Sequence, residues 1–124
     1  MTTETELYAP YLERAKVQSG GEIFLNPSDS LDLVATCERM EIAVIGVEAF
    51  RIDARGTMPY SDAIADYSPR TTTPWRVFEQ QCNRSALNFL QRAIASKGQE
   101  TWFSFVLLDS AEYDDCLREI GAAR

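Results

Sequence analysis

The stretch Ile42–Asp53, IAVIGVEAFRID, is the clearest strand pattern in the sequence, and the expected fold is built outward from it. Its first half, Ile42–Val47, is apolar at every position, which is typical of a strand covered on both faces at the centre of a sheet. Its second half alternates, so that side chains are predicted to face two ways: Val47, Ala49 and Arg51 to one side, and Glu48, Phe50 and Ile52 to the other.

Helical and extended patterns alternate on both sides of this strand. Helical spacing or capping signals predict helices over residues 7–18, 28–40 and 74–98 and from residue 109 onward, and short apolar runs predict strands at 22–26 and 101–108. Strands separated by helices usually pair in parallel. The sequence therefore predicts one domain, residues 1–124, with an α/β fold: a small, mostly parallel sheet of about three strands with helices packed on it. Four helices are enough to cover both faces of such a sheet. An extra hairpin between residues 51 and 75 is an alternative.

The composition limits the classes of partner. The chain has 124 residues, 45% of them hydrophobic, and a net charge of −7. An acidic surface repels phosphate backbones, so nucleic-acid binding is disfavoured and a basic protein partner is favoured. No apolar run is long enough to span a membrane, and the N-terminus lacks the basic leader of a secreted protein. Three separated cysteines set among apolar residues indicate buried thiols. We therefore expect a cytoplasmic protein.

Several catalytic and metal-binding patterns are missing. The sequence has no histidine, no CxxC pair and no glycine-rich phosphate loop. We therefore expect no catalytic residue, no metal site and no cofactor. A carboxylate pair stays open as an alternative, because Asp62 and Asp66 would share one face if SDAIADY formed a helical turn. Such a pair could flank a substrate or a cation, or it could be an ordinary solvated acidic face.

Residues 51–75 form the candidate interface. The segment shows no long periodic pattern, and loops of this length are uncommon in small domains and tend to be functional. Tyrosine, tryptophan and arginine commonly anchor protein interfaces, and carboxylates among them suit a basic target. Including the upstream strand, the predicted partner-binding residues are Glu48, Arg51, Asp53, Tyr60, Asp62, Asp66, Tyr67 and Trp75.

Each of these residues also has a plain structural interpretation. The aromatic residues of the segment could simply close the hydrophobic core. Glu48 stands in an otherwise apolar run, where a carboxylate is costly unless it is paired or has reached solvent. Arg51 is the expected ion-pair partner of Glu48.

The run ERMEIAVIGVEAFRI, followed by a polar loop, a helix and WFSFVLL, resembles small bacterial immunity proteins of polymorphic toxin systems over roughly residues 30–108. The resemblance implies a cytosolic antidote that binds a cognate toxin domain and blocks it. An acidic antidote would suit a basic nuclease toxin. The alternatives are a regulatory or scaffold domain that binds a cellular protein, and an unrecognised enzyme that uses carboxylates.

Overall fold

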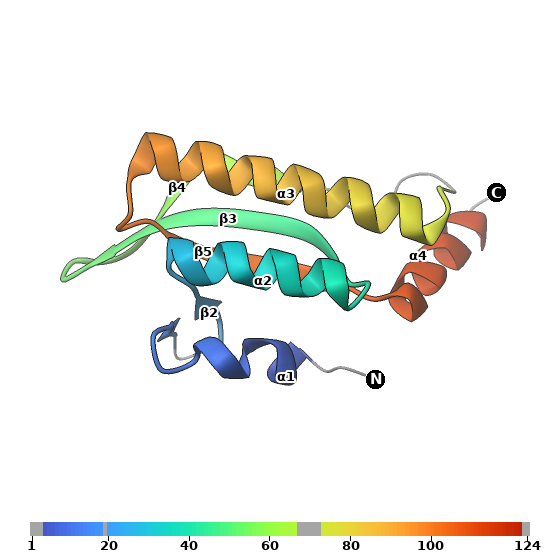
Figure 1. The fold of residues 1–124 in the computed structure, drawn as a ribbon, viewed down its shortest axis with the longest axis horizontal. Coiled ribbons are helices and arrows are strands. Elements are labelled where there is room, and N and C mark those ends of the chain that lie inside the picture. The colour runs from blue at the N-terminus through green and yellow to red at the C-terminus, as the bar shows by residue number, and fades with distance from the viewer. Residues whose placement is uncertain (1–3, 19, 67–72, 123–124) are drawn as a thin grey trace.

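A computed structural model describes residues 4–18, 20–66 and 73–122, with side chains described in these ranges except at 61–66 and 120–122 (Figure 1). The elements, in chain order, are α1 (Glu4–Tyr8), the short 3-10 helix η1 (Ala9–Tyr11), β1 (Lys16–Val17), β2 (Ile23–Phe24), α2 (Pro27–Arg39), β3 (Ala43–Asp53), β4 (Gly56–Asp66), α3 (Trp75–Lys97), β5 (Trp102–Leu108) and α4 (Ser110–Ala122). None of the helices in these ranges combines the length and the apolar character that crossing a membrane requires.

The main sheet is antiparallel, so the prediction of a mostly parallel sheet is wrong. Its strand order is β4-β3-β5, and β3 is antiparallel to both neighbours. β4 and β5 therefore run in the same direction, and α3 connects them. The strand–helix–strand pattern does yield two strands of equal direction, but β3 lies between them. A second, two-stranded antiparallel sheet is formed by β1 and β2.

A tight hairpin between β3 and β4 is the physical reason for this difference. Asp53 pairs with Gly56 across a two-residue turn, and the Asp53 Oδ1 atom accepts a hydrogen bond of 2.9 Å from the Arg55 N–H. Gly56 has a φ of 124°, a conformation that side chains disfavour. The expectation of a long irregular loop is thus wrong for residues 51–66, and the hairpin alternative is confirmed.

Helix α3 spans the length of this hairpin. Its 23 residues correspond to about 35 Å, close to the ~36 Å of an 11-residue strand such as β3. The helix therefore returns the chain from the end of β4 to the opposite end of the sheet, where β5 begins. Because α3 crosses β3 on the way, β5 pairs with the free side of β3 and not with β4.

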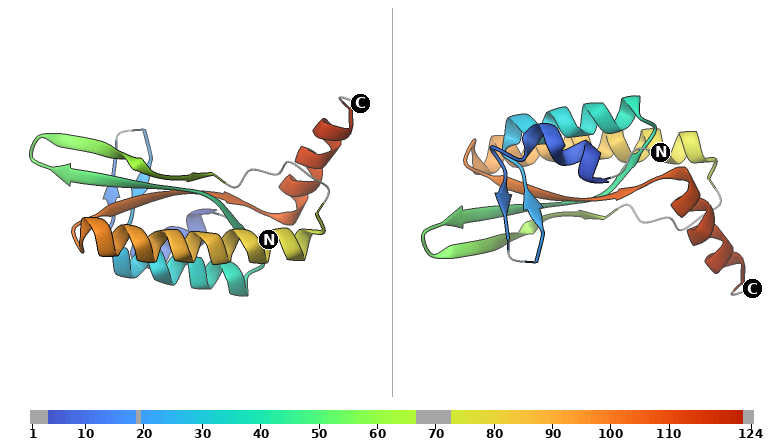
Figure 2. Two further views of the ribbon diagram at one scale, coloured as in Figure 1. Left: turned by 90° about the horizontal axis from the view of Figure 1, so that it is seen from above. Right: turned by 90° about the horizontal axis from the view of Figure 1, so that it is seen from below.

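Helices α2 and α3 pack side by side against one face of the sheet (Figure 2). The expectation of helices on both faces is wrong for the described residues. The covered face of β3 contributes Val44, Val47 and Ala49 to the main core, together with Leu33 of α2 and Leu90 of α3. The predicted alternation is confirmed at Val47 and Ala49, which belong to the main core, whereas Glu48 between them is half-buried and lies outside it. Arg51 lies beyond the core and is exposed.

The other face of the sheet is bordered by two elements. The β1–β2 hairpin lies at one end, where the Phe24 and Phe50 rings meet edge to face at 4.8 Å and Gln18 Nε2 donates to Thr57 Oγ1 at 2.8 Å. Helix α4 leaves the opposite end of the sheet toward this same side (Figure 2). Between them lie Glu48 of β3 and its cross-strand neighbour Ser104 of β5, both half-buried.

The outer edge of β5 is paired at one residue only. The N–H and C=O groups of Phe103 both bond to Leu25, at 2.9 and 2.8 Å. Backbone groups alternate in direction along a strand, so those of Phe105 and Leu107 also face away from β3. In the described part of the chain no strand pairs with this edge of β5 between β2 and α4 (Figure 2, right).

We expect amide hydrogen exchange to distinguish the paired from the unpaired backbone N–H groups of β5. The Ser104 N–H faces β3 and should exchange roughly 100-fold more slowly than the Phe105 and Leu107 N–H groups, because its exchange requires a local opening of ~3 kcal/mol. Residue-resolved exchange followed by NMR measures the three rates. Equal protection at Ser104 and Phe105 would contradict the strand edge described above.

Candidate partner-binding site

The predicted interface residues around the hairpin do not form one cluster. Arg51 pairs with Asp53, with 3.2 Å between Nε and Oδ2, and both side chains are largely solvent-accessible. The predicted ion pair between Arg51 and Glu48 is wrong, because residues separated by an odd number of positions lie on opposite faces of a strand. Glu48 has no ion pair among the described residues and lies on the face away from α2 and α3.

The predicted aromatic residues pack mainly inward. Tyr60 is half-buried against the main core, and the Lys97 Nζ atom lies 4.9 Å from its ring centroid. Trp75 is half-buried against a second core cluster, 5.3 Å from the Tyr113 ring and 6.2 Å from the Phe78 ring. These contacts match the core interpretation of both residues, and they leave part of each ring exposed.

The acidic pair of the segment lies on a strand. Asp62 and Asp66 belong to β4, so the predicted helical turn is wrong. The backbone of Asp66 is in register with Gly46 of β3, whereas Asp62 falls where the β3–β4 register shifts. Tyr67 lies outside the described residues.

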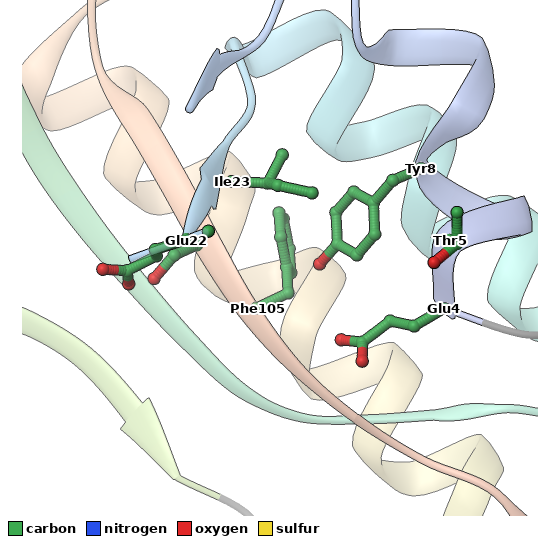
Figure 3. A pocket seen from close by; sticks show the side chains of 8 residues that line it. Glu4, Thr5, Tyr8, Glu22, Ile23 and Phe105 are labelled. Atoms are coloured by element: carbon green, nitrogen blue, oxygen red, sulfur yellow. The ribbon is translucent and has the colours of Figure 1, made fainter. Parts of the chain in front are cut away.

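A cavity of about 300 Å³ opens where β2 separates from β5 (Figure 3). β2 touches β5 through the single Leu25–Phe103 bridge among the described residues and then diverges, and Ile23 and Phe105 both line the gap, facing Tyr8. Helix α1 closes the third side. The lining residues are Glu4, Thr5, Tyr8, Gly21, Glu22, Ile23, Ser104 and Phe105.

The Tyr8 hydroxyl points into this cavity, between the Phe105 ring and the Glu4 carboxylate (Figure 3). Tyr8 is only 5% exposed, yet its hydroxyl has no hydrogen-bond partner among the described residues. Burial raises the pKa of Tyr8 well above its ordinary value, and the charge of Glu4 raises it further. At neutral pH the hydroxyl is therefore protonated and available to a ligand.

The rim of the cavity is acidic. Glu4 and Glu22 are exposed and have no ion pair among the described residues. Glu48 adds a third carboxylate nearby, because its cross-strand neighbour Ser104 lines the cavity. A cavity with an unsatisfied hydroxyl inside and carboxylates at its mouth can accept a cationic group that carries hydrogen-bonding atoms.

The sequence predicts Tyr8 within the first helix and assigns no role to Glu4 or Glu22. The available signal was the cluster ETELY, in which two acids precede an aromatic residue. Nothing in that cluster indicates β5 as its neighbour, since the two segments lie about 100 positions apart in the sequence.

We expect Tyr8→Phe to leave stability almost unchanged, within about 0.5 kcal/mol, because no internal hydrogen bond is lost. The matched control is Tyr11→Phe. The Tyr11 hydroxyl donates to Asp32 Oδ2 at 2.6 Å, so its removal should cost about 1 kcal/mol or more. Urea denaturation of both variants measures the difference, and a large loss in Tyr8→Phe would reveal an internal partner for that hydroxyl.

A second polar cluster lies inside the molecule, between α2, α3 and the start of β3. The Asn83 Nδ2 atom is 2.9 Å from acceptors on Glu38, Glu79 and the Ile42 carbonyl, and Asn83 Oδ1 accepts from the Val44 N–H at 2.8 Å. Arg76 donates to Glu79. The cluster thus joins both helices to the central strand.

The two carboxyl groups of this cluster have opposite pKa shifts. Burial raises the pKa of Glu79 to about 7, with the hydrogen bond to Glu38 adding to the effect. That same hydrogen bond, with the one from Asn83, lowers the pKa of Glu38. Close carboxyl groups of this kind share one proton over a range of pH.

The pair is better explained as a structural contact that joins the two helices to β3 than as a catalytic acid and base. The Glu79 side chain is fully buried, and its oxygens are already bonded to Arg76, Asn83 and Glu38. A cavity of about 460 Å³ beside α2 and α3 reaches Glu38 and Asn83, but Glu79 does not line it. Within the described ranges, no group of three or more cysteine or acidic side chains is arranged to hold a metal ion.

Glu79 should make stability fall as the pH rises from 5 to 8. An unfolded glutamate loses its proton near pH 4.5, whereas folded Glu79 keeps it to about pH 7. The folded state therefore binds more protons within that window, and deprotonation there costs stability, roughly 1–3 kcal/mol. The lowered pKa of Glu38 acts at lower pH, so it does not offset this loss.

The Glu79→Gln variant should abolish this pH dependence, because a glutamine side chain does not titrate. Denaturation at several pH values measures it, with Glu119→Gln on the exposed face of α4 as the control for a change of charge alone. If the free energy of unfolding of the wild-type protein does not change between pH 5 and 8, Glu79 loses its proton at the ordinary pH of a glutamate.

Comparison with models of known protein families finds no match, and comparison with curated proteins finds no significant match either. The resemblance to immunity proteins therefore stays a prediction.

Proposed function

We propose that the chain is a non-catalytic, immunity-type inhibitor that binds a basic toxin domain and blocks it by occlusion. The observation that carries the proposal is the β5 edge with its adjoining cavity, where carboxylates without ion pairs lie at the mouth and a tyrosine hydroxyl without a described protein partner lies inside. Unpaired backbone groups, acidic side chains and a polar cavity together favour a protein partner that brings basic residues and hydrogen-bonding atoms.

The mechanism needs no chemical step. Toxins that act on nucleic acids carry basic residues where they bind phosphate, and carboxylates such as Glu4, Glu22 and Glu48 can neutralise those residues directly. The net charge of −7 speeds the encounter with a basic surface through long-range attraction. Once the acidic surface is docked, the toxin's substrate is excluded from its site.

The decisive experiment is neutralisation in cells. The protein encoded by the adjacent upstream gene is expressed from an inducible promoter, alone or together with this chain, and growth is followed. We expect growth arrest when that protein is expressed alone and recovery on co-expression. Equal killing with and without this chain would remove the proposed function.

Charge-reversed variants locate the interface in the same experiment. Glu4→Lys with Glu22→Lys should lose protection, since it places two cations at the cavity mouth. Asp114→Lys with Glu119→Lys makes the same change in net charge on the exposed face of α4, and it should retain protection. Asp62→Lys with Asp66→Lys tests the surface predicted from the sequence. Loss of protection in this last pair alone would move the interface to β4.

A further inference from the structure

We propose that the outer edge of β5 receives an extended segment of the partner as an additional strand, and that a basic side chain of this segment enters the Tyr8 cavity. The proposal deepens the proposed function, on which it rests, by naming the mode of binding and the chemistry of the bound segment.

The backbone argument comes from β5 itself. Phe105 and Leu107 direct their N–H and C=O groups outward beyond the Leu25–Phe103 bridge, and the described residues supply no partner for them. An incoming strand can bond to both residues, which gives room for a short segment of about four residues. The exposed side chain of Val106, at 57% accessibility, offers an apolar contact beside the new strand.

The divergence of β2 determines where such a strand ends. Had β2 continued in register, Ile23 would pair with Phe105, but the bridge ends at Leu25–Phe103 and both residues line the cavity. A strand that pairs with Leu107 and Phe105 therefore runs into this gap and places its last side chain there. A volume of about 300 Å³ is at the small end of ligand sites, which suits a single side chain.

The lining of the cavity selects a basic side chain. Glu4 and Glu22 supply charge at its mouth, and Tyr8, a largely buried residue, supplies a hydroxyl that points into it. The hydroxyl faces the open cavity and is not a buried atom without a partner, so it can exchange solvent for a hydrogen bond to a polar group of the ligand. An apolar side chain would form no such bond, and an acidic side chain would be repelled by Glu4 and Glu22.

Charge also argues against a second copy of this chain on the same edge. Pairing two β5 edges would bring together two molecules of net charge −7, each with Glu4 and Glu22 near the contact. Like charges placed close together in an interface are destabilising. A segment of opposite charge meets no such repulsion, so we assign the edge to a basic strand of another protein.

The test uses the full-length chain and three synthetic hexapeptides with blocked ends. The first peptide alternates lysine and valine, the second replaces lysine with glutamate, and the third is the lysine peptide with alternate backbone nitrogens methylated. We expect the first, at millimolar concentration, to slow amide exchange at Phe105 and Leu107 at least tenfold. The glutamate peptide and the methylated peptide, which lacks the backbone donors that face β5, should leave both rates unchanged.

Variants of the cavity residues distinguish binding in the cavity from general attraction of the lysine peptide to a negatively charged protein. Tyr8→Phe, and Glu4→Gln with Glu22→Gln, should each weaken binding of the lysine peptide about tenfold. The matched pair Asp114→Asn with Glu119→Gln should change it less than twofold. Equal weakening in all variants would overturn the assignment of the cavity.

The remaining outcomes are also decisive. Peptide binding without slower exchange at Phe105 and Leu107 would overturn strand addition, as would the absence of binding at millimolar peptide. Slower exchange that grows with protein concentration alone would assign the edge to a second copy. Each of these results leaves the neutralisation experiment free to succeed, so failure of the binding mode is distinct from failure of the proposed function.

Discussion

Both strand pairings of the main sheet involve β3, and this constraint determines where unsatisfied backbone groups lie. β4 and β5 each have one inner edge bonded to β3 and one outer edge without a strand partner along most of its described length. The outer edge of β5 bonds to Leu25 at one residue and then loses its neighbour as β2 diverges. The same divergence creates the cavity, so edge and cavity have one structural origin.

The packing on the other side explains why the sheet stays in this arrangement. Asn83 projects from α3 and bonds to the backbone at Ile42 and Val44, the residues at which β3 begins. Such bonds satisfy peptide groups that would otherwise be buried without partners, which is costly. They also hold a carboxyl pair, Glu38 and Glu79, inside the molecule. The two helices are thereby tied to the central strand through polar contacts as well as through the core.

The sequence revealed β3 because its pattern depends only on local burial: an apolar half followed by an alternating half. It did not reveal β4, since Met58, Pro59 and a series of acids interrupt any alternation. Asp53 and Gly56 were the available turn signals. Without that hairpin, the rule that strands joined by helices are parallel gave the wrong sheet, although it does describe the relative direction of β4 and β5.

Similar limits apply to the polar sites. Glu79 and Asn83 lie one turn apart on the buried side of α3, a polar pair within an apolar stripe, and this spacing could have marked them. Tyr8 gave no comparable signal. Its role depends on a cavity formed by segments distant in sequence, and no periodicity along a single segment contains that information.

An exposed strand edge is a hazard for any protein, because it can pair with the edge of another copy. Here the hazard is limited by the acids near the edge: Glu4 and Glu22 would face their own counterparts in a self-pairing. The same carboxylates do not oppose a basic strand, and the Tyr8 hydroxyl in the cavity can bond to its side chain. In the proposed binding mode, the acids that oppose self-pairing of the edge are therefore the same groups that select a basic partner.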